Sequence, residues 1–274
     1  MPFKLFTTLR YDPLLLKAHN NPSFTHAGWN YTHRSPCYML DLHRDRILRA
    51  ATYWHWAAVL PLLSGSPGLT TLETAIDAFL GSPCRGGDDA RAYRLRVLVN
   101  EQAELKFEKA DEAPRPLEAL FPSALSAEKA GDGGPGRGPA FDVVLDREGT
   151  ERSAYTHYKT TRRQMYDDAR ERAGLRVGEP KEVIIVNGAD GSVMEGSVTT
   201  PYFLRGGTWV TPPVPSVFAE ENGGAGQDGT TRRWALMNGL VVEKVVKADE
   251  LNDGEAVWLS NGAKGFLFGI FKSG

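Results

Sequence analysis

The sequence predicts a two-domain α+β protein, and three observations lead to that prediction. The N-terminal part alternates segments typical of strands with segments that carry apolar residues at helical spacing. Four glycines and a proline lie within residues 131–136, a composition that favours a connection between domains. The C-terminal part contains apolar runs joined by short turns, as in hairpins. We therefore expect an N-terminal domain over residues 1–122, a Gly/Pro-rich linker over 123–140 and a C-terminal domain over 141–274.

Length and composition exclude several classes of protein. A chain of 274 residues can bury a sizeable core, and its net charge of −2 gives no reason to expect nucleic acid or an anionic membrane as partner. Two cysteines are too few for a disulfide framework. No apolar run is long enough to span a membrane, and the N-terminus lacks signal-peptide character. We expect a cytoplasmic protein, and we predict no metal-binding residue.

The N-terminal elements follow from local composition. Residues 3–11 are rich in aromatic and β-branched residues and predict a strand, whereas the Asn, Pro, Gly and Ser of residues 20–36 predict an irregular loop. Apolar residues at helical spacing predict a helix from about His43. After the breaker S-G-S-P-G, a second helix is expected to begin with a capping box formed by Thr70 and Glu73.

Residues 92–99 alternate in polarity and predict a strand, which places Arg94 and Arg96 on one side. Two guanidiniums on one face would suit a substrate with two carboxylates, because arginine binds carboxylate through a bidentate fork. The equal alternative is a polar strand face paired with acidic neighbours such as Glu104 on the next strand.

The C-terminal elements are expected in a regular order. Hairpins are predicted where A-D-G-S and G-G separate apolar runs, and a helix should begin at G-T-T-R. The expected elements are a strand at 141–146, an extended piece at 155–159, a helix at 160–173 ending at Gly174, a strand at 182–187 with a return strand that ends in M-E-G-S, a hairpin from T-T-P-Y-F to G-G-T-W-V-T-P-P, a helix opened by Gly229, and a strand with a turn at 255–263.

Two side chains of the C-terminal half suggest chemistry. Lys159 is expected where an extended segment gives way to a helix, and Glu195 on the return strand of a hairpin. A lysine amine forms a Schiff base with an aldehyde, and a buried carboxylate can hold a pyridine nitrogen protonated, so the pair would suit pyridoxal 5′-phosphate. Gly196 would leave room for a planar ring close to the backbone. A helix that opens with G-T-T would bind an anion through its first backbone N–H groups, at Gly229, Thr230 and Thr231.

The order and spacing of these motifs resemble the fold-type IV pyridoxal-phosphate enzymes, the class IV aminotransferase family. K-T-T-x-R at Lys159 is followed after 36 residues by E-G-S-x-T-T-P-Y-F at Glu195, after 34 more by G-T-T-R at Gly229, and then by L-S-N-G. Within the family the chain most resembles the 4-amino-4-deoxychorismate lyases, especially the fungal form. Its F-T-T-L-R strand is similar to their F-T-T-x-R, where transaminases usually carry a glutamate. The resemblance implies a smaller N-terminal α/β domain, a larger β-barrel-like C-terminal α/β domain, and a homodimer.

The resemblance also implies roles for individual residues. Lys159 would be the catalytic residue, and Arg46 would bind the cofactor phosphate, although without the family it belongs to a solvated basic face. The implied cofactor-binding residues are Arg46, Lys159, Glu195, Gly229, Thr230, Thr231, Ser260 and Asn261. The implied contacts with a substrate that bears an amine and carboxylates are Thr7, Thr8, Arg94, Arg96 and Arg163.

The implied reaction is the elimination of pyruvate from 4-amino-4-deoxychorismate, which leaves 4-aminobenzoate for folate synthesis. One alternative is an aminotransferase that acts on D-amino acids, branched-chain amino acids or amines, since both reactions begin with proton removal next to the substrate nitrogen. The other alternative is a binding module for an anion or nucleotide, in which G-T-T-R serves only as a phosphate cradle.

Overall fold

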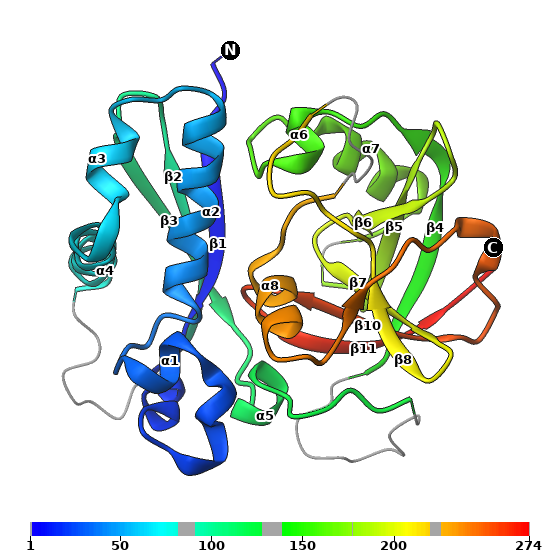
Figure 1. The fold of residues 1–274 in the computed structure, drawn as a ribbon, viewed down its shortest axis with the longest axis horizontal. Coiled ribbons are helices and arrows are strands. Elements are labelled where there is room, and N and C mark those ends of the chain that lie inside the picture. Colours follow the sequence, from blue (N-terminus) through cyan, green and yellow to red (C-terminus); the bar gives the residue numbers. More distant parts are fainter. Residues whose placement is uncertain (1, 82–90, 128–138, 177, 220–225, 274) are drawn as a thin grey trace. The chain divides into compact units, whose positions relative to one another are not determined.

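The chain folds into two units, which are described separately (Figure 1). Unit 1 comprises residues 1–117 and 158–162, and unit 2 comprises residues 118–157 and 163–274. The pentapeptide that carries Lys159 therefore clusters with the N-terminal unit, although the sequence analysis assigned it to the C-terminal domain. The computed structural model describes residues 2–81, 91–127, 139–176, 178–219 and 226–273, so most of the predicted linker lies outside the described residues.

Unit 1 is built on an antiparallel sheet in the order β1-β2-β3. The extended segment around Lys159 lies along the other edge of β1, where Phe6 N donates to Lys159 O at 3.1 Å and Leu5 pairs with Thr160. The two strands predicted in this half are confirmed. The strands are β1 (Leu5–Tyr11), β2 (Ala92–Val99) and β3 (Leu105–Glu112).

Helices of unit 1 pack beside this sheet, with α2 (Leu40–Tyr53) running along β1 (Figure 1). The α3 helix (Val59–Leu63) leads into α4 (Gly65–Leu80). The predicted capping box is wrong, because α4 begins at Gly65 and the Thr70 hydroxyl donates to Ser66 O inside the helix. The sequence breaker S-G-S-P-G is compatible with the first helical turn, where a proline needs no N–H partner.

The segment predicted as an irregular loop, residues 20–36, contains two short helical turns, and a third turn precedes it. Asn21 caps the first turn inside the segment, because its side chain accepts a hydrogen bond from Ser23 N, and Asp12 caps the preceding turn by accepting from Leu14 N. A polar residue that predicted a loop, Asn21, therefore also serves as a cap. The turns are η1 (Pro13–Ala18), η2 (Pro22–Ala27) and α1 (Trp29–Thr32).

Unit 2 contains an eight-stranded sheet in the order β6-β5-β4-β11-β10-β7-β8-β9, in which β4 runs parallel to both neighbours. Val193 N of β6 donates to Val246 O at 2.8 Å, three residues after β9. This bond brings the two edges of the sheet together, which confirms the barrel-like C-terminal architecture. The strands are β4 (Phe141–Thr150), β5 (Lys181–Asn187), β6 (Val193–Gly196), β7 (Thr200–Arg205), β8 (Thr208–Thr211), β9 (Val242–Glu243), β10 (Ala256–Asn261) and β11 (Gly265–Phe271).

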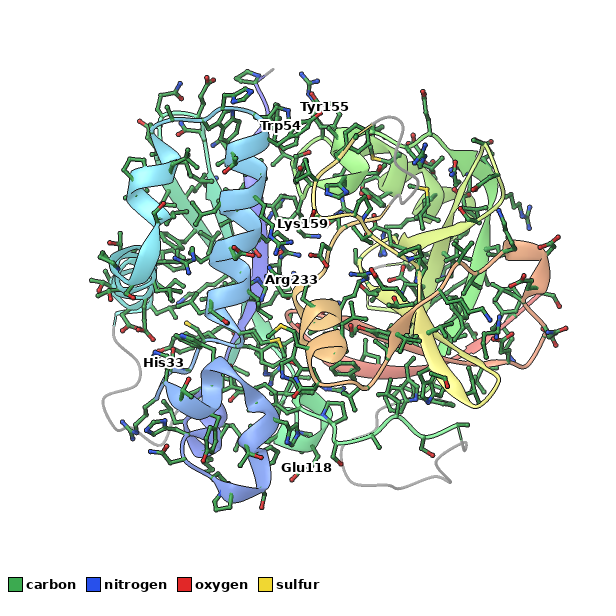
Figure 2. The ribbon with its side chains drawn as sticks, in the orientation of Figure 1. His33, Trp54, Glu118, Tyr155, Lys159 and Arg233 are labelled. Carbon is green, nitrogen blue, oxygen red and sulfur yellow. The ribbon has the colours of Figure 1, made fainter. Side chains whose placement is uncertain are left out.

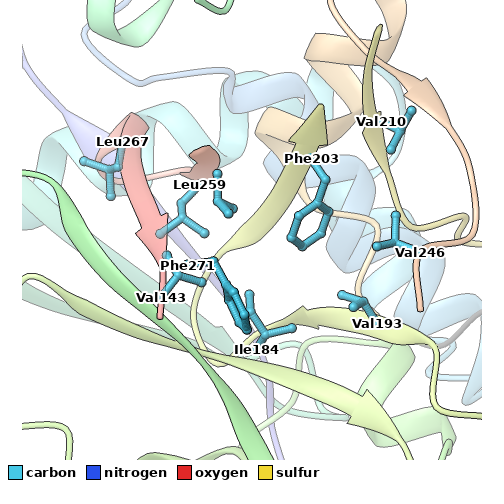
Figure 3. Close-up of a cluster of buried hydrophobic side chains, with 10 residues drawn as sticks. Val143, Ile184, Val193, Phe203, Val210, Val246, Leu259, Leu267 and Phe271 are labelled. Carbon is cyan, nitrogen blue, oxygen red and sulfur yellow. The ribbon is translucent and has the colours of Figure 1, made fainter. Parts of the chain in front are cut away.

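The core of unit 2 fills the curled sheet with side chains from several strands (Figure 3). Ile184 of β5 faces this core, whereas its neighbours Val183 and Ile185 face α7 (Gln164–Arg172), as alternation along a strand requires. The buried residues of the core are Val143, Ile184, Val193, Phe203, Val210, Val246, Val257, Leu259, Leu267 and Phe271.

The helices of unit 2 differ in part from the prediction. The piece before Lys159 expected to be extended is a helical turn, α6 (Ala154–His157), whose first turn is closed by Ser153. The α7 helix begins four residues later than expected, at Gln164. The helix expected at G-T-T-R is confirmed as α8 (Thr230–Met237). Two further short elements are α5 (Leu117–Leu120) and η3 (Ala248–Glu250). Within the described ranges, none of the helices has the length and apolar character needed to cross a membrane.

Candidate active site

The direction of the Glu195 side chain is set by a β-bulge in β6. The register with β5 shifts at this point, which leaves Met194 as an extra residue on β6. Plain alternation from Val193, which faces the barrel core, would send Glu195 into that core. The bulge instead brings Glu195 to the side of Met194, which packs against Tyr166 of α7.

The Glu195 carboxylate is buried and bonded to a buried tyrosine. Its exposed fraction is 6%, and the Tyr166 hydroxyl donates to Oε1 at 2.5 Å. Gln227 Nε2 in turn donates to the Tyr166 hydroxyl at 3.3 Å. Burial, followed by the charge of Glu195, raises the pKa of Tyr166 well above its usual value, so the hydroxyl remains a donor.

The turn that follows Glu195 is held by a second buried carboxylate, Glu182 of β5, which is 1% exposed. A Cβ on Gly196 would lie 2.4 Å from Thr199 Oγ1 and 3.1 Å from Glu182 Cδ. The glycine therefore permits a tight turn, which differs from the expected role of leaving room for a ring. Glu182 accepts hydrogen bonds from Val183 N, Ser197 N, Ser197 Oγ, Val198 N and Thr199 Oγ1.

The N-terminus of α8 carries a set of buried hydroxyl groups. Gly229 is the N-cap residue, and Thr230 and Thr231 are each 1% exposed. The Ser260 hydroxyl lies 2.7 Å from Thr231 Oγ1 and 2.7 Å from the Tyr202 hydroxyl. Hydroxyl groups beside the first N–H groups of a helix form a donor set that suits a phosphate group. The structure thus joins Ser260 to the G-T-T-R helix, 29 residues earlier in sequence.

Two other predicted residues of unit 2 have local partners. Asn261 Oδ1 accepts from Ala263 N at 3.0 Å and Lys264 N at 2.8 Å, so it shapes the turn between β10 and β11. Arg163 pairs with Asp167 at 3.0 Å, and its guanidinium lies 5.5 Å from the centre of the Tyr166 ring. Arg163 is therefore a neighbour of the tyrosine that bonds Glu195.

Lys159 lies beside β1 in unit 1 (Figure 2). Its Nζ is 5.0 Å from the centre of the Phe6 ring, and Arg96 Cζ is 4.1 Å from the same centre. The structure thus brings a lysine amine and a guanidinium to one aromatic ring. Arg96 also pairs with Glu108 at 3.6 Å, on the strand where the sequence analysis expected Glu104 to be the partner.

The remaining predicted residues on this sheet are less enclosed. Thr8 is half-buried and lies opposite Arg96 in the β1–β2 register, whereas Arg94 is exposed. Glu104 accepts a hydrogen bond from Asn100 Nδ2 at 2.7 Å, so it serves the turn between β2 and β3. Of the two β2 arginines predicted to meet a substrate, Arg96 is therefore the one that shares the Phe6 ring with Lys159.

Arg46 of α2 belongs to a cluster with Thr7 and His43. Arg46 Nη2 donates to Thr7 Oγ1, and Thr7 Oγ1 lies 2.6 Å from His43 Nδ1. Because the threonine oxygen accepts from arginine, we assign its proton to the bond with His43 Nδ1. Burial, then the charges of Arg46 and Lys159, lower the pKa of His43 well below its usual value. His43, which lies three residues before Arg46, was expected only as the approximate start of a helix.

Because His43 is buried and neutral, we expect the folded protein to lose stability in mild acid. Its folded-state pKa is depressed, so its contribution is fully present above pH about 6.5 and is lost as the pH falls toward the folded value. At pH 5.5 the unfolded chain binds almost one extra proton here, which lowers the free energy of unfolding by about 1.4 kcal/mol. Urea denaturation at pH 7.5 and 5.5 should show this loss of stability in the parent protein but not in His43→Gln. The control variant His55→Gln changes an exposed histidine, so it should lose the same stability between the two pH values as the parent protein does.

We expect a larger side chain at Gly226 to lower the stability of the protein, because Gly226 packs on the backbone that carries Glu195. A Cβ at this position would lie 2.6 Å from Met194 O and 2.9 Å from Glu195 Cβ. We expect Gly226→Ala to lower the free energy of unfolding by about 1–3 kcal/mol, since backbone atoms must move. Gly226→Val should cost more. If chemical denaturation gives the parent and both variants the same stability, the contact between residue 226 and the backbone at Met194 and Glu195 has room for a side chain.

A comparison with known families assigns the chain to one of them. The model of the amino-transferase class IV family matches residues 28–268. The chain belongs to the class IV aminotransferase family. The confirmed two-domain fold with its barrel-like C-terminal unit is the fold-type IV architecture that the sequence motifs predicted.

Relatives of this class IV family member include enzymes of two kinds. An aminodeoxychorismate lyase from Saccharomyces cerevisiae is 26% identical over 214 residues, which cover 68% of this chain and 53% of the yeast protein. The chain spans about half the length of the curated relatives that it matches. A 4-amino-4-deoxychorismate lyase structure from Pseudomonas aeruginosa is similar with a TM-score of 0.57 and 16% identity, over 98% of this chain and 83% of that one. A fold IV-transaminase structure from Curtobacterium pusillum gives a TM-score of 0.58 and 16% identity, over 98% of this chain and 78% of that one.

Within each unit of this class IV protein, the structure groups some predicted residues and adds others. In unit 1, Thr7 contacts Arg46, and Lys159 and Arg96 share the Phe6 ring. In unit 2, Thr231 contacts Ser260. The residues that the sequence analysis did not single out are Phe6, His43, Tyr166, Glu182, Tyr202 and Gln227.

Proposed function

We propose that this protein is a pyridoxal-phosphate-dependent 4-amino-4-deoxychorismate lyase, which releases pyruvate and forms 4-aminobenzoate, a folate precursor. The observation that carries the proposal is the arrangement in unit 1, where the Lys159 amine and the Arg96 guanidinium meet at the Phe6 ring. An amine that reacts with an aldehyde, close to a cation that binds carboxylate, is what an amino acid-like substrate requires. The named lyase among the relatives supports the choice of reaction.

The donor set of the chain fits the chemical groups of pyridoxal phosphate. The hydroxyls of Thr231 and Ser260 at the start of α8 suit its phosphate, as do the backbone N–H groups of the helix. The buried Glu195 carboxylate suits its ring nitrogen, and the Lys159 amine suits its aldehyde. Arg46 would add a cation for the phosphate.

The residues of this chain would then act as follows. When bound, pyridoxal phosphate supplies an electron sink for the negative charge left on the substrate carbon. Lys159 Nζ would remove the proton from the substrate carbon that bears the amine, as a general base. Loss of the neighbouring enolpyruvyl ether would then break one carbon–oxygen bond, and the released fragment would take up a proton to become pyruvate. The ring that remains becomes aromatic, and no oxidant is consumed.

Arg96 and Arg163 would bind the substrate carboxylates, while Thr7 and Thr8 would contact the substrate from β1. The F-T-T-L-R strand favours the lyase over a transaminase, because Thr7 and Thr8 occupy positions near which transaminases usually carry a glutamate. Thr7 already contacts Arg46 and His43, which holds its hydroxyl in one direction. We further propose that the active protein is a homodimer, which sedimentation velocity would test.

The deciding experiment supplies the purified protein with pyridoxal phosphate and 4-amino-4-deoxychorismate. A lyase yields pyruvate and 4-aminobenzoate in equal amounts, without any amino acceptor. A transaminase instead converts the cofactor to its pyridoxamine form with an amino acid and yields no pyruvate from aminodeoxychorismate. A protein that stays colourless with pyridoxal phosphate would support the binding-module alternative and overturn the proposal.

A further inference from the structure

We propose that Tyr166 is the positioning residue of Glu195, and that its buried hydroxyl holds this carboxylate charged and in one direction. The inference rests on the proposed function, in which Glu195 meets the ring nitrogen of the cofactor. The fold-type IV motifs that predicted Lys159 and Glu195 do not include Tyr166, which lies seven residues beyond the lysine. The evidence for this role is the geometry around the tyrosine hydroxyl.

The Tyr166 hydroxyl has one proton and two acceptors within reach. Glu195 Oε1 lies at 2.5 Å and the Thr156 carbonyl oxygen at 3.2 Å. A hydrogen bond to a charged oxygen is shorter and about twice as strong as one between neutral groups, so the proton goes to Glu195. The bond stabilises the ionised form of the carboxyl group.

The tyrosine is itself fixed by its surroundings. Its ring packs in a buried cluster with Ala169, Val183, Ile185 and Met194, and it is 2% exposed. Gln227 Nε2 donates to the hydroxyl oxygen at 3.3 Å, which polarises the O–H bond toward Glu195. Arg163 is a charged neighbour of the tyrosine: its guanidinium lies 5.5 Å from the ring centre and pairs with Asp167.

The role of Tyr166 is to keep the proton shared by the cofactor ring nitrogen and Glu195 on the nitrogen. A proton between a pyridine nitrogen and a carboxylate stays on nitrogen when the ionised carboxylate is stabilised. Without the tyrosine hydroxyl, Glu195 becomes a stronger base and draws the proton away from the ring. Tyr166 would thereby keep the cofactor a strong electron sink without touching the substrate.

The first test uses the protein without cofactor. Glutamate labelled with ¹³C at Cδ reports each carboxyl group in a pH titration by NMR, and Glu195→Gln assigns the signal of Glu195. We expect Tyr166→Phe, which keeps the packed ring, to shift the Glu195 titration upward by about one pH unit. Gln227→Leu should shift it in the same direction by less. An unchanged Glu195 titration in Tyr166→Phe overturns the proposal.

Two controls separate this effect from a general loss of structure. Glu182 is a buried carboxylate of the same unit that accepts no bond from Tyr166, so its signal should not move. Tyr38→Phe alters a fully buried tyrosine of unit 1 and should leave the Glu195 titration as it is. Equal movement of Glu182 and Glu195 in Tyr166→Phe would mark a structural disturbance and overturn the proposal.

The second test loads the protein with pyridoxal phosphate labelled with ¹⁵N in the ring. We expect the ¹⁵N chemical shift of the parent protein to report a protonated nitrogen, and that of Tyr166→Phe to move toward the unprotonated value. An identical shift in both would overturn the role of Tyr166 at the ring. If the parent protein fails to bind pyridoxal phosphate, the proposed function fails, whereas the titration still decides the coupling of Tyr166 to Glu195.

Discussion

Lys159→Ala is expected to abolish the visible absorption band of the protein loaded with pyridoxal phosphate and to lower pyruvate formation by at least about 10³-fold. The change removes the amine that would hold the cofactor and the general base that would take the substrate proton. A general base alone typically contributes about 10² to 10⁴-fold to a rate. Absorption spectra and a coupled assay for pyruvate measure both effects on the same sample.

Two variants serve as controls for this experiment. Lys159→Arg keeps a cation beside the Phe6 ring but supplies no amine of suitable basicity, so it should lose the band and the activity as well. Lys17→Ala changes an exposed lysine of unit 1 and should keep both. Activity of Lys159→Ala within tenfold of the parent protein would contradict the assignment of Lys159.

Glu182→Gln is expected to lower the free energy of unfolding by about 2–4 kcal/mol. The side chain is 1% exposed and accepts five hydrogen bonds, at distances of 2.6 Å to 3.4 Å. Glutamine replaces one acceptor oxygen by an N–H donor, which then faces other donors in a buried place. Chemical denaturation followed by circular dichroism measures the loss.

The location of the damage can be tested separately. Because four of the five bonds bind β5 to the turn after Glu195, hydrogen exchange in Glu182→Gln should accelerate most at residues 197–199. Glu171→Gln on the exposed side of α7 should change stability by less than about 0.5 kcal/mol. A loss below about 1 kcal/mol in Glu182→Gln would show that the bonds contribute little.

Much of the architecture could be predicted because local patterns and long-range structure agree. The β1 strand has the aromatic and β-branched residues typical of strands, β2 alternates in polarity, and the hairpin of β7 and β8 turns at the G-G that separates two apolar runs. The α8 helix begins directly after Gly229, the glycine that marked it, which is its N-cap residue. The motifs with their spacing led to the class IV family, which the family model bears out.

Other features depend on contacts that a single sequence does not display. The bulge at Met194 reverses the face of Glu195, and no period-two reading of β6 predicts it. The bonds of Glu195 and Glu182 join residues from β5, β6 and α7, so the pattern of one segment could not reveal Tyr166 or Glu182. At α4, the Gly and Pro that signalled a break lie within the first helical turn, which tolerates them.

The pentapeptide 158–162 bears on how the chain reaches its final form. It covers the edge of β1, yet it is synthesised about 150 residues after that strand. A nascent chain ending at residue 117 would contain all three strands of the first sheet and still expose an unpaired edge, which invites pairing with other chains. Folding of the first unit is therefore complete only after the whole of β4 and the lysine segment that follows it have left the ribosome.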